Sequence, residues 1–152
     1  MSNLDVRIVN LEPLHVAAAY GFGTNPEEQA WNKLLAWLKA KGIDAKAQRF
    51  FGFNNPSPSA GSPNYGYEQW VITGSEVEGN GEIKIKEFPG GLYAVTRCSL
   101  SHIGEVWQQL AAWRESSRYQ AGHHQWLEEG LTPPIDGFSE DAELDLYLPI
   151  RV

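Results

Sequence analysis

A spacing that occurs twice constrains the fold of this chain more than any other feature of its sequence. The motif W-x-x-L-x-x-W at positions 31–37 recurs at positions 107–113, which gives an offset of 76 (107 − 31) in a chain of 152 residues. Pro13 and Pro89 are related by the same offset (89 − 13 = 76). Chance produces one such coincidence more easily than two in the same order. The two halves of the chain are therefore predicted to be copies of one structural unit.

Both copies predict the same secondary-structure elements in the same order. A helix is expected after Asn25-Pro26, because proline suits a first helical turn, and it ends at Gly42, a natural stop. The second helix is expected from about His102 to Glu115, with its apolar residues at helical spacing. β-like runs lie before and after each helix, at residues 6–11, 15–19, 46–53 and 67–73 in the first copy and at 83–88, 92–98, 124–131 and 143–150 in the second.

These elements predict an α+β fold built from two tandem, duplicated βαββ modules, which form an antiparallel sheet with two long helices. The pseudo-repeats cover about residues 1–76 and 77–152. A unit of that size can hardly bury a hydrophobic core alone, so residues 1–152 are predicted to be a single domain in which the modules share one core. The junction between two such modules commonly holds a ligand, and an inter-module pocket is therefore expected.

The charge and the cysteine content exclude several classes of protein. The net charge is −7 and the twelve Lys and Arg residues are scattered, which argues against direct binding of nucleic acid. A single cysteine, Cys98, excludes an internal disulfide and a thiolate zinc site, and we expect no cofactor and no metal. The N-terminus lacks a signal segment and no apolar run is long enough to span a membrane. A cytoplasmic protein without membrane contact is therefore expected.

The six Trp, six Tyr and six Phe residues suggest a pocket or an interface, although the helix tryptophans are first of all expected in the core. One candidate segment is Tyr65–Trp70, where strand alternation places Glu68 on the same face as Trp70. At an offset of 76 the counterpart of Glu68 is Leu144 (68 + 76), on the apolar face of the last strand. A carboxylate in such a place is either a hydrogen-bonded structural anchor or a site for a cation or a proton.

A second candidate is Trp126 with Glu128, which point the same way from a strand. An aromatic wall beside a carboxylate suits a flat organic cation, because the ring attracts the charge and the carboxylate neutralises it where water is scarce. The same pair suits acid–base chemistry, because desolvation raises the pKa of a glutamate. The third interpretation is an edge strand with two solvated glutamates, Glu128 and Glu129, and the spacing alone favours this one.

Six segments carry a resemblance to a known family when they are taken together and in order. They are FGFNNP (51–56), YGYEQW (65–70), PGGLYAVTRC (89–98), the W-x-x-L-x-x-W motif, HQWLEE (124–129) and LDLYLPI (144–150). The chain resembles the GyrI-like small-molecule-binding family, which includes the effector-binding domains of AraC-type and MerR-type multidrug regulators. The resemblance runs nearly end to end. It implies two βαββ modules with a pocket between them for bulky, often cationic and aromatic, ligands.

The resemblance also implies roles for individual residues. In the family, an acidic residue on the strand after the second helix anchors the charge of the ligand. Glu128 matches that position, and Glu129 is the alternative one residue away. The other residues expected to line the pocket are Phe53, Glu68, Trp70, Tyr93, Trp126 and Tyr147. The chain departs from the regulators in lacking a helix-turn-helix segment, so a regulator protein or a second copy of the chain is the partner to expect.

We therefore expect a stand-alone binding domain for bulky aromatic, preferentially cationic, small molecules. Two alternatives stay open. Some relatives hydrolyse cyclopropane-bearing DNA-alkylating compounds, and in that case Glu128 or Glu68 would activate water or protonate the leaving position. Others are described as protecting DNA gyrase from protein toxins, which would make the chain a protein-interaction module. The sequence leaves open whether the chain is an enzyme, what its natural ligand is and how many copies assemble.

Overall fold

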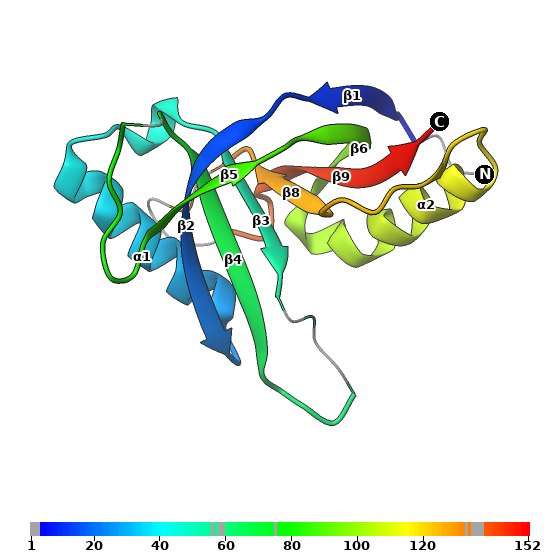
Figure 1. Ribbon diagram of the computed structural model, residues 1–152. Coiled ribbons are helices and arrows are strands. Elements are labelled where there is room, and N and C mark those ends of the chain that lie inside the picture. The colour runs from blue at the N-terminus through cyan, green and yellow to red at the C-terminus, as the bar shows by residue number, and fades with distance from the viewer. Residues whose placement is uncertain (1–3, 56, 58–59, 75, 133, 135–138) are drawn as a thin grey trace.

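Two strands, a helix and two further strands follow one another in both halves of the chain, and the second half adds one two-residue strand directly after its helix (Figure 1). The computed structural model describes residues 4–152 with the exception of 56, 58–59, 75, 133 and 135–138. The first half forms β1 (Arg7–Leu11), β2 (Leu14–Gly23), α1 (Pro26–Lys41), a 3₁₀ turn (Ala45–Ala47), β3 (Phe50–Asn54) and β4 (Tyr65–Ile72). The second half forms β5 (Lys84–Phe88), β6 (Gly91–Ser99), a 3₁₀ turn (Leu100–His102), α2 (Ile103–Glu115), β7 (Gln120–Ala121), β8 (Leu127–Gly130) and β9 (Glu143–Arg151). The predicted α+β fold of duplicated modules is thereby confirmed.

The described strands form an antiparallel sheet in the order β1-β6-β9-β8-β3-β4-β2-β5, and the short β7 pairs with β9. The first strand of each half pairs with the other half, since β1 lies beside β6 and β5 lies beside β2. The halves also meet in the middle of the sheet, where β3 lies beside β8. Neither half therefore completes its part of the sheet without the other, which agrees with the small size of the repeat.

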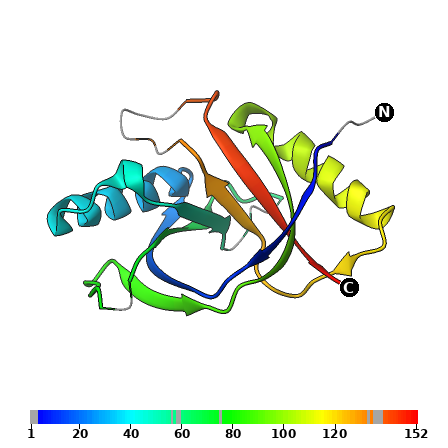
Figure 2. The ribbon, with the colours of Figure 1, turned by 90° about the horizontal axis from the view of Figure 1, so that it is seen from above.

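Both helices cover the same face of the sheet, α1 over the first half and α2 over the second (Figure 2). The opposite face carries a further hydrophobic cluster, to which both halves contribute. The repeated motif places equivalent leucines in the core, and Leu34 and Leu110 are both fully buried. Pro26 opens α1, and Gly42 ends it in the left-handed conformation (φ 71°), as the sequence predicts. Among the described helices, none has the length and apolar character that crossing a bilayer requires.

The helices of the two copies are related by an offset of 76, and so are β3 and β8, but β2 and β4 are related to β6 and β9 by an offset of 77. β2 and β4 pair Ala18 with Trp70, whereas β6 and β9 pair Val95 with Tyr147. Both positions of the second pair exceed those of the first by the larger offset (95 − 18 = 77 and 147 − 70 = 77). All four side chains belong to the cluster on the face away from the helices. Because side chains alternate along a strand, an offset that is wrong by one position reverses the face assigned to every side chain.

This shift corrects the counterpart of Glu68, which is Asp145 (68 + 77) and not Leu144. Both carboxylates are buried, and both are paired with cations. Glu68 accepts hydrogen bonds from Trp70 Nε1 at 2.6 Å and from Lys86 Nζ at 2.7 Å. Its counterpart is held by two arginine side chains at 2.8 Å and 3.0 Å. Of the two roles that the sequence leaves open for Glu68, these contacts agree with the structural anchor.

Candidate functional site

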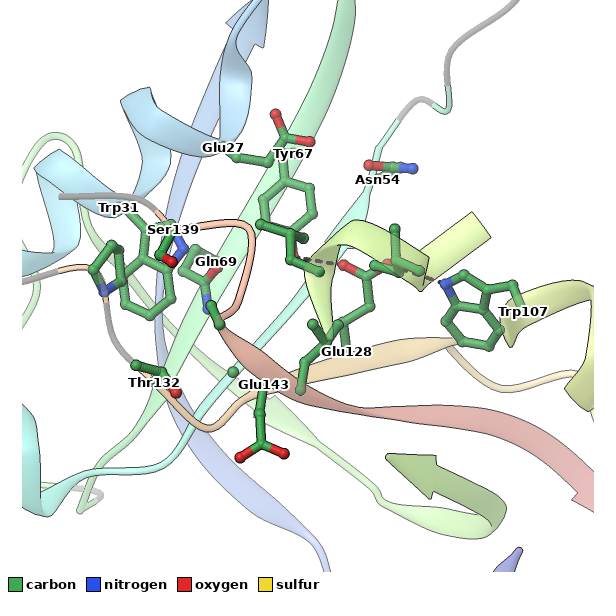
Figure 3. A pocket seen from close by; sticks show the side chains of 16 residues that line it. Glu27, Trp31, Asn54, Tyr67, Gln69, Trp107, Glu128, Thr132, Ser139 and Glu143 are labelled. Carbon is green, nitrogen blue, oxygen red and sulfur yellow. Dashed lines mark hydrogen bonds between the residues drawn. The ribbon is translucent and has the colours of Figure 1, made fainter. Parts of the chain in front are cut away.

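A cavity of about 350 Å³ opens between α1 and α2 on the helix-covered face of the sheet (Figure 3). Its described lining is Glu27 and Trp31 of α1, Asn54 of β3, Tyr67 and Gln69 of β4, Leu100, Ile103 and Trp107 in and before α2, Glu128 and Gly130 of β8, and Thr132, Pro134, Ser139, Ala142, Glu143 and Leu144 before and within β9. Both halves contribute, so the cavity lies at the junction that the duplication predicts. Its volume falls in the usual range of small-molecule sites.

The local twofold axis that relates the two modules passes through this region. β3 and β8 run antiparallel with Gly52 opposite Glu128, and these two residues are counterparts at the offset of 76 (128 − 52). An antiparallel pair made of two equivalent residues requires the axis to pass between them. Trp31 and Trp107 occupy equivalent positions of the two helices and line the cavity from its two sides (Figure 3). The site is therefore symmetric in framework and asymmetric in chemistry.

Glu128 projects from β8 into the cavity, where two donors approach it from opposite sides (Figure 3). Tyr67 Oη donates to Oε1 over 3.0 Å, and Trp107 Nε1 donates to Oε2 over 3.2 Å. Among the described residues, no Lys, Arg or His forms an ion pair with it. Burial raises the pKa of Glu128 above its ordinary 4.5, the two hydrogen bonds offset part of this rise, and the charge of Glu27 adds to it.

The contact between Tyr67 and Glu128 depends on the glycine at the symmetric position. A Cβ atom on Gly52 would overlap the hydroxyl group and the ring of Tyr67. Burial and the charge of Glu128 raise the pKa of Tyr67 well above 10.0, so the phenol stays protonated and remains a donor. The missing side chain at Gly52 thus gives Tyr67 the room to reach the carboxylate.

A second carboxylate, Glu27 in the first turn of α1, lies at the same cavity. Tyr65 Oη donates to both of its oxygens at 2.8 Å. Burial, followed by this hydrogen bond, raises the pKa of Tyr65 to about 12. None of the described lining residues carries a positive charge. The described lining of the cavity therefore combines apolar and aromatic side chains with carboxylates and contains no basic side chain.

Two further residues from the predicted set, Trp126 and Phe53, line a second cavity of about 420 Å³. Trp126 is 47% exposed, and its ring centroid lies 5.2 Å from that of Trp107 with the planes tilted by 45°. Glu128, Trp107 and Asn54 line both cavities, so the second cavity adjoins the first.

The other four residues predicted to line the pocket lie on the opposite face of the sheet. Trp70, Tyr93 and Tyr147 are buried in the hydrophobic cluster there, and Glu68 projects from the same face. Strand alternation explains this placement, because Trp70 follows the cavity residue Gln69 and so points the other way. These four side chains pack on the face of the sheet away from the helices and do not line the cavity.

Glu129, the alternative charge anchor, also points away from the cavity. Its carboxylate binds Arg49 Nε at 2.8 Å and accepts a hydrogen bond from Tyr147 Oη at 2.7 Å. Glu128 is the member of the pair that faces the cavity, and within the described residues it has no countercharge.

Sequence reasoning missed Tyr67 and Gln69 as cavity residues and treated Trp31 and Trp107 mainly as core. A signal for the first pair existed, because the alternation that groups Glu68 with Trp70 puts Tyr67 and Gln69 together on the other face. The signal for the tryptophans was their recurrence in both copies. Equivalent residues on two helices that flank a twofold axis face the same central space.

Two modules that share one sheet, with a cavity at their junction, have the fold of a GyrI-like effector-binding domain. Residues 7–150 match the family model Cass2, described as integron-associated effector binding protein, and the chain belongs to this family. The resemblance seen in the sequence is thereby confirmed. No curated protein sequence matches the chain at a significant level.

Several solved structures share the fold at low sequence identity. The C-terminal domain of EcmrR superposes with a TM-score of 0.70 at 11% identity, covering 99% of this chain and 99% of that one. A hydrolase from Listeria innocua gives a TM-score of 0.70 at 11% identity, covering 96% of this chain and 91% of that one. SAV2435, solved bound to tetraphenylphosphonium, gives 0.55 at 9% identity, covering 97% and 94%. At these identities the likeness concerns the fold.

Proposed function

We propose that this chain binds bulky aromatic cations in the cavity between α1 and α2, with Glu128 as the anchor for the positive charge. One observation carries the proposal. Glu128 is a partly buried carboxylate at the floor of an aromatic cavity, and its described partners are two neutral donors, Tyr67 and Trp107. A carboxylate in such a place is costly unless a cation joins it. The complex of the structurally similar SAV2435 with tetraphenylphosphonium, an aromatic cation, agrees with this proposal.

The walls of the cavity supply the preference for aromatic ligands. Trp31 and Trp107 present indole rings on the two sides of the junction, and Tyr67 adds a third ring beside the carboxylate. Ring faces attract cations and stack on aromatic groups without demanding one particular shape. This arrangement would accept aromatic ligands of different shapes but would require a positive charge.

The experiment compares two ligands of the same shape and opposite charge, tetraphenylphosphonium and tetraphenylborate, by quenching of tryptophan fluorescence and by calorimetry. Wild type should bind the phosphonium and reject the borate. Glu128→Gln should weaken phosphonium binding by about thirtyfold or more, since breaking a buried charge pair costs about 2 kcal/mol or more. Glu105→Gln, an exposed residue of α2 outside the cavity, is the matched control and should bind as wild type.

Two results would contradict the proposal. One is a Glu128→Gln protein that binds the phosphonium as tightly as wild type does. The other is equal affinity of wild type for the phosphonium and the borate, because the cavity would then select shape and not charge.

Hydrolysis of an electrophilic ligand is the second candidate, and the surroundings of Glu128 favour it. Burial raises the pKa of Glu128, and the hydroxyl of Tyr67 lies 3.0 Å from its Oε1. Such a carboxyl group suits proton transfer to or from water or a leaving group. Product analysis after incubation with a cyclopropane-bearing alkylator tests this: turnover that disappears in Glu128→Gln supports hydrolysis, and ligand recovered unchanged from wild type removes it.

A further inference from the structure

The second cavity shares part of its wall with the first. Three residues, Asn54, Trp107 and Glu128, line both. The second cavity, of about 420 Å³, adds Phe53 and Trp126 among its walls. Two spaces of similar volume therefore meet at one carboxylate.

Trp107 forms the partition between these spaces. Its indole nitrogen donates to Glu128 Oε2 at 3.2 Å, while its ring lies 5.2 Å from the ring of Trp126. The other carboxylate oxygen, Oε1, faces Tyr67 in the first cavity. Glu128 thus stands at the boundary, with an aromatic side chain at each of its oxygens.

We propose that the two cavities are the lobes of one site for elongated cations, which carry an aromatic group on each side of a single central positive charge. The charge lies at Glu128, one aromatic group enters the cavity between α1 and α2, and the other stacks on Trp126. This inference rests on the proposed function, because it uses the same carboxylate, and it adds the shape of the ligand and the place of its second ring.

The charges of the second lobe restrict the ligand further. Apart from Glu128, its described lining is neutral, with Phe53, Trp126 and the amide of Gln125 as main walls. A second positive charge in this lobe would be desolvated without a carboxylate of its own, which is unfavourable. The second lobe therefore takes an uncharged aromatic group, and the positive charge of the ligand lies at Glu128.

Pinacyanol matches this description, because its positive charge is delocalised along a short bridge between two quinoline rings. N-ethylquinaldinium is one half of the same molecule, and it is expected to fill the first lobe, the cavity between α1 and α2. Both are titrated against wild type, Glu128→Gln, Trp126→Ala and Phe22→Ala. Phe22 is the matched control, an aromatic residue 51% exposed on β2 and outside both cavities.

Trp126→Ala should weaken pinacyanol binding about tenfold, because one aromatic stack and its buried area are lost. The same variant should change the affinity for N-ethylquinaldinium by less than about twofold, because this smaller dye has no second ring to stack on Trp126. Phe22→Ala should bind both dyes as wild type does. Circular dichroism and thermal midpoints of the variants confirm that they fold.

Three outcomes overturn the two-lobed site. In the first, Trp126→Ala leaves pinacyanol affinity unchanged. In the second, it weakens both dyes by the same factor, which places Trp126 in a single compact site. In both of these cases, sensitivity of the dyes to Glu128→Gln keeps the proposed function intact. In the third, neither dye shows binding that depends on Glu128, and the proposed function fails together with the second lobe.

Discussion

The two halves of the molecule place equivalent elements around the cavity, but they bury them to different extents. In α1 six residues are buried against the sheet, whereas in α2 the buried residue is Leu110. Trp31 is 8% exposed and packs on Phe50, with 4.8 Å between the ring centroids. Its counterpart Trp107 is partly exposed and bonds to Glu128. The comparison indicates that α1 packs more tightly on the sheet than α2 does, and that Trp107 of the second half is more accessible from the cavity than its counterpart.

The strands at the axis show the same difference between the halves. Glu128 of the second half faces Gly52 of the first, so the axis holds one carboxylate where strict duplication would give two. Two carboxylates so close would repel each other, and one would stay protonated. The glycine also leaves room for Tyr67, whose structural counterpart is the apolar Leu144 (67 + 77). Duplication thus supplies the shape of the cavity, and divergence supplies its charge.

The largest effect is expected when the equivalent leucine of each helix, Leu34 in α1 and Leu110 in α2, is replaced by alanine. Leu34→Ala should lower the free energy of unfolding by about 4 kcal/mol and Leu110→Ala by about 2 kcal/mol, within the usual range for buried leucines. The difference is expected because the other apolar side chains of α2 are partly exposed, so they can shift to fill the cavity that the substitution leaves. Urea unfolding followed by circular dichroism measures both. Equal losses, or a larger loss for Leu110→Ala, would show that the two helices stabilise the fold alike.

A smaller effect is expected from filling the gap at the axis. Gly52→Ala should destabilise the protein by about 1–3 kcal/mol, because the added methyl group displaces the Tyr67 ring. Tetraphenylphosphonium binding should weaken about tenfold, since the lost hydrogen bond joins a charged group. Calorimetry and urea unfolding give the two values. Gly104→Ala, at an α2 position where a Cβ meets nothing within 4 Å, is the control and should slightly stabilise the protein.

How much of the fold follows from the sequence can be judged from the offset. The helix motif gave the alignment of Leu34 with Leu110, both fully buried, because the two tryptophans on either side of each leucine fix the register. In β2 and β4 a shift of one position changes the offset to 77, and the counterpart of Glu68 becomes Asp145. Proline spacing and apolar content do not reveal so small a shift, yet it reverses the face of every side chain.

The site shows a different limit. Alternation along β4 correctly separates Glu68 and Trp70 from Tyr67 and Gln69, but it does not say which face the helices cover. Both faces of this strand are buried, one under α1 and the other under the opposite hydrophobic cluster. With two apolar faces, no polar stripe marks the solvent side. For Glu128 the family resemblance favoured one of two faces that periodicity alone could not distinguish, and it left Glu129 as the alternative.

The smallest predicted effect is a change in thermal stability, which should have opposite signs for Glu128 in the cavity and for Glu68 on the opposite face of the sheet. The pKa of Glu128 is raised by folding, so its contribution to stability is fully present at low pH and is lost as the pH rises through the raised pKa. Glu128→Gln should therefore be more stable than wild type at pH 7 and equal to it near pH 4. Because the side chain is partly exposed in the cavity, screening limits the gain to less than about 1 kcal/mol, or about 2–4 °C in the thermal midpoint.

Glu68→Gln supplies the opposite sign, because it removes the partner of Lys86 and of the Trp70 indole and should lower the midpoint at pH 7. Thermal scans of both variants and wild type between pH 4 and pH 8 measure the difference. A gain for Glu128→Gln that coincides with its loss of phosphonium binding means that the wild-type residue is kept for its ligand. A loss of stability in both variants would instead make Glu128 a structural anchor like Glu68, and the contrast between the two faces of the sheet would disappear.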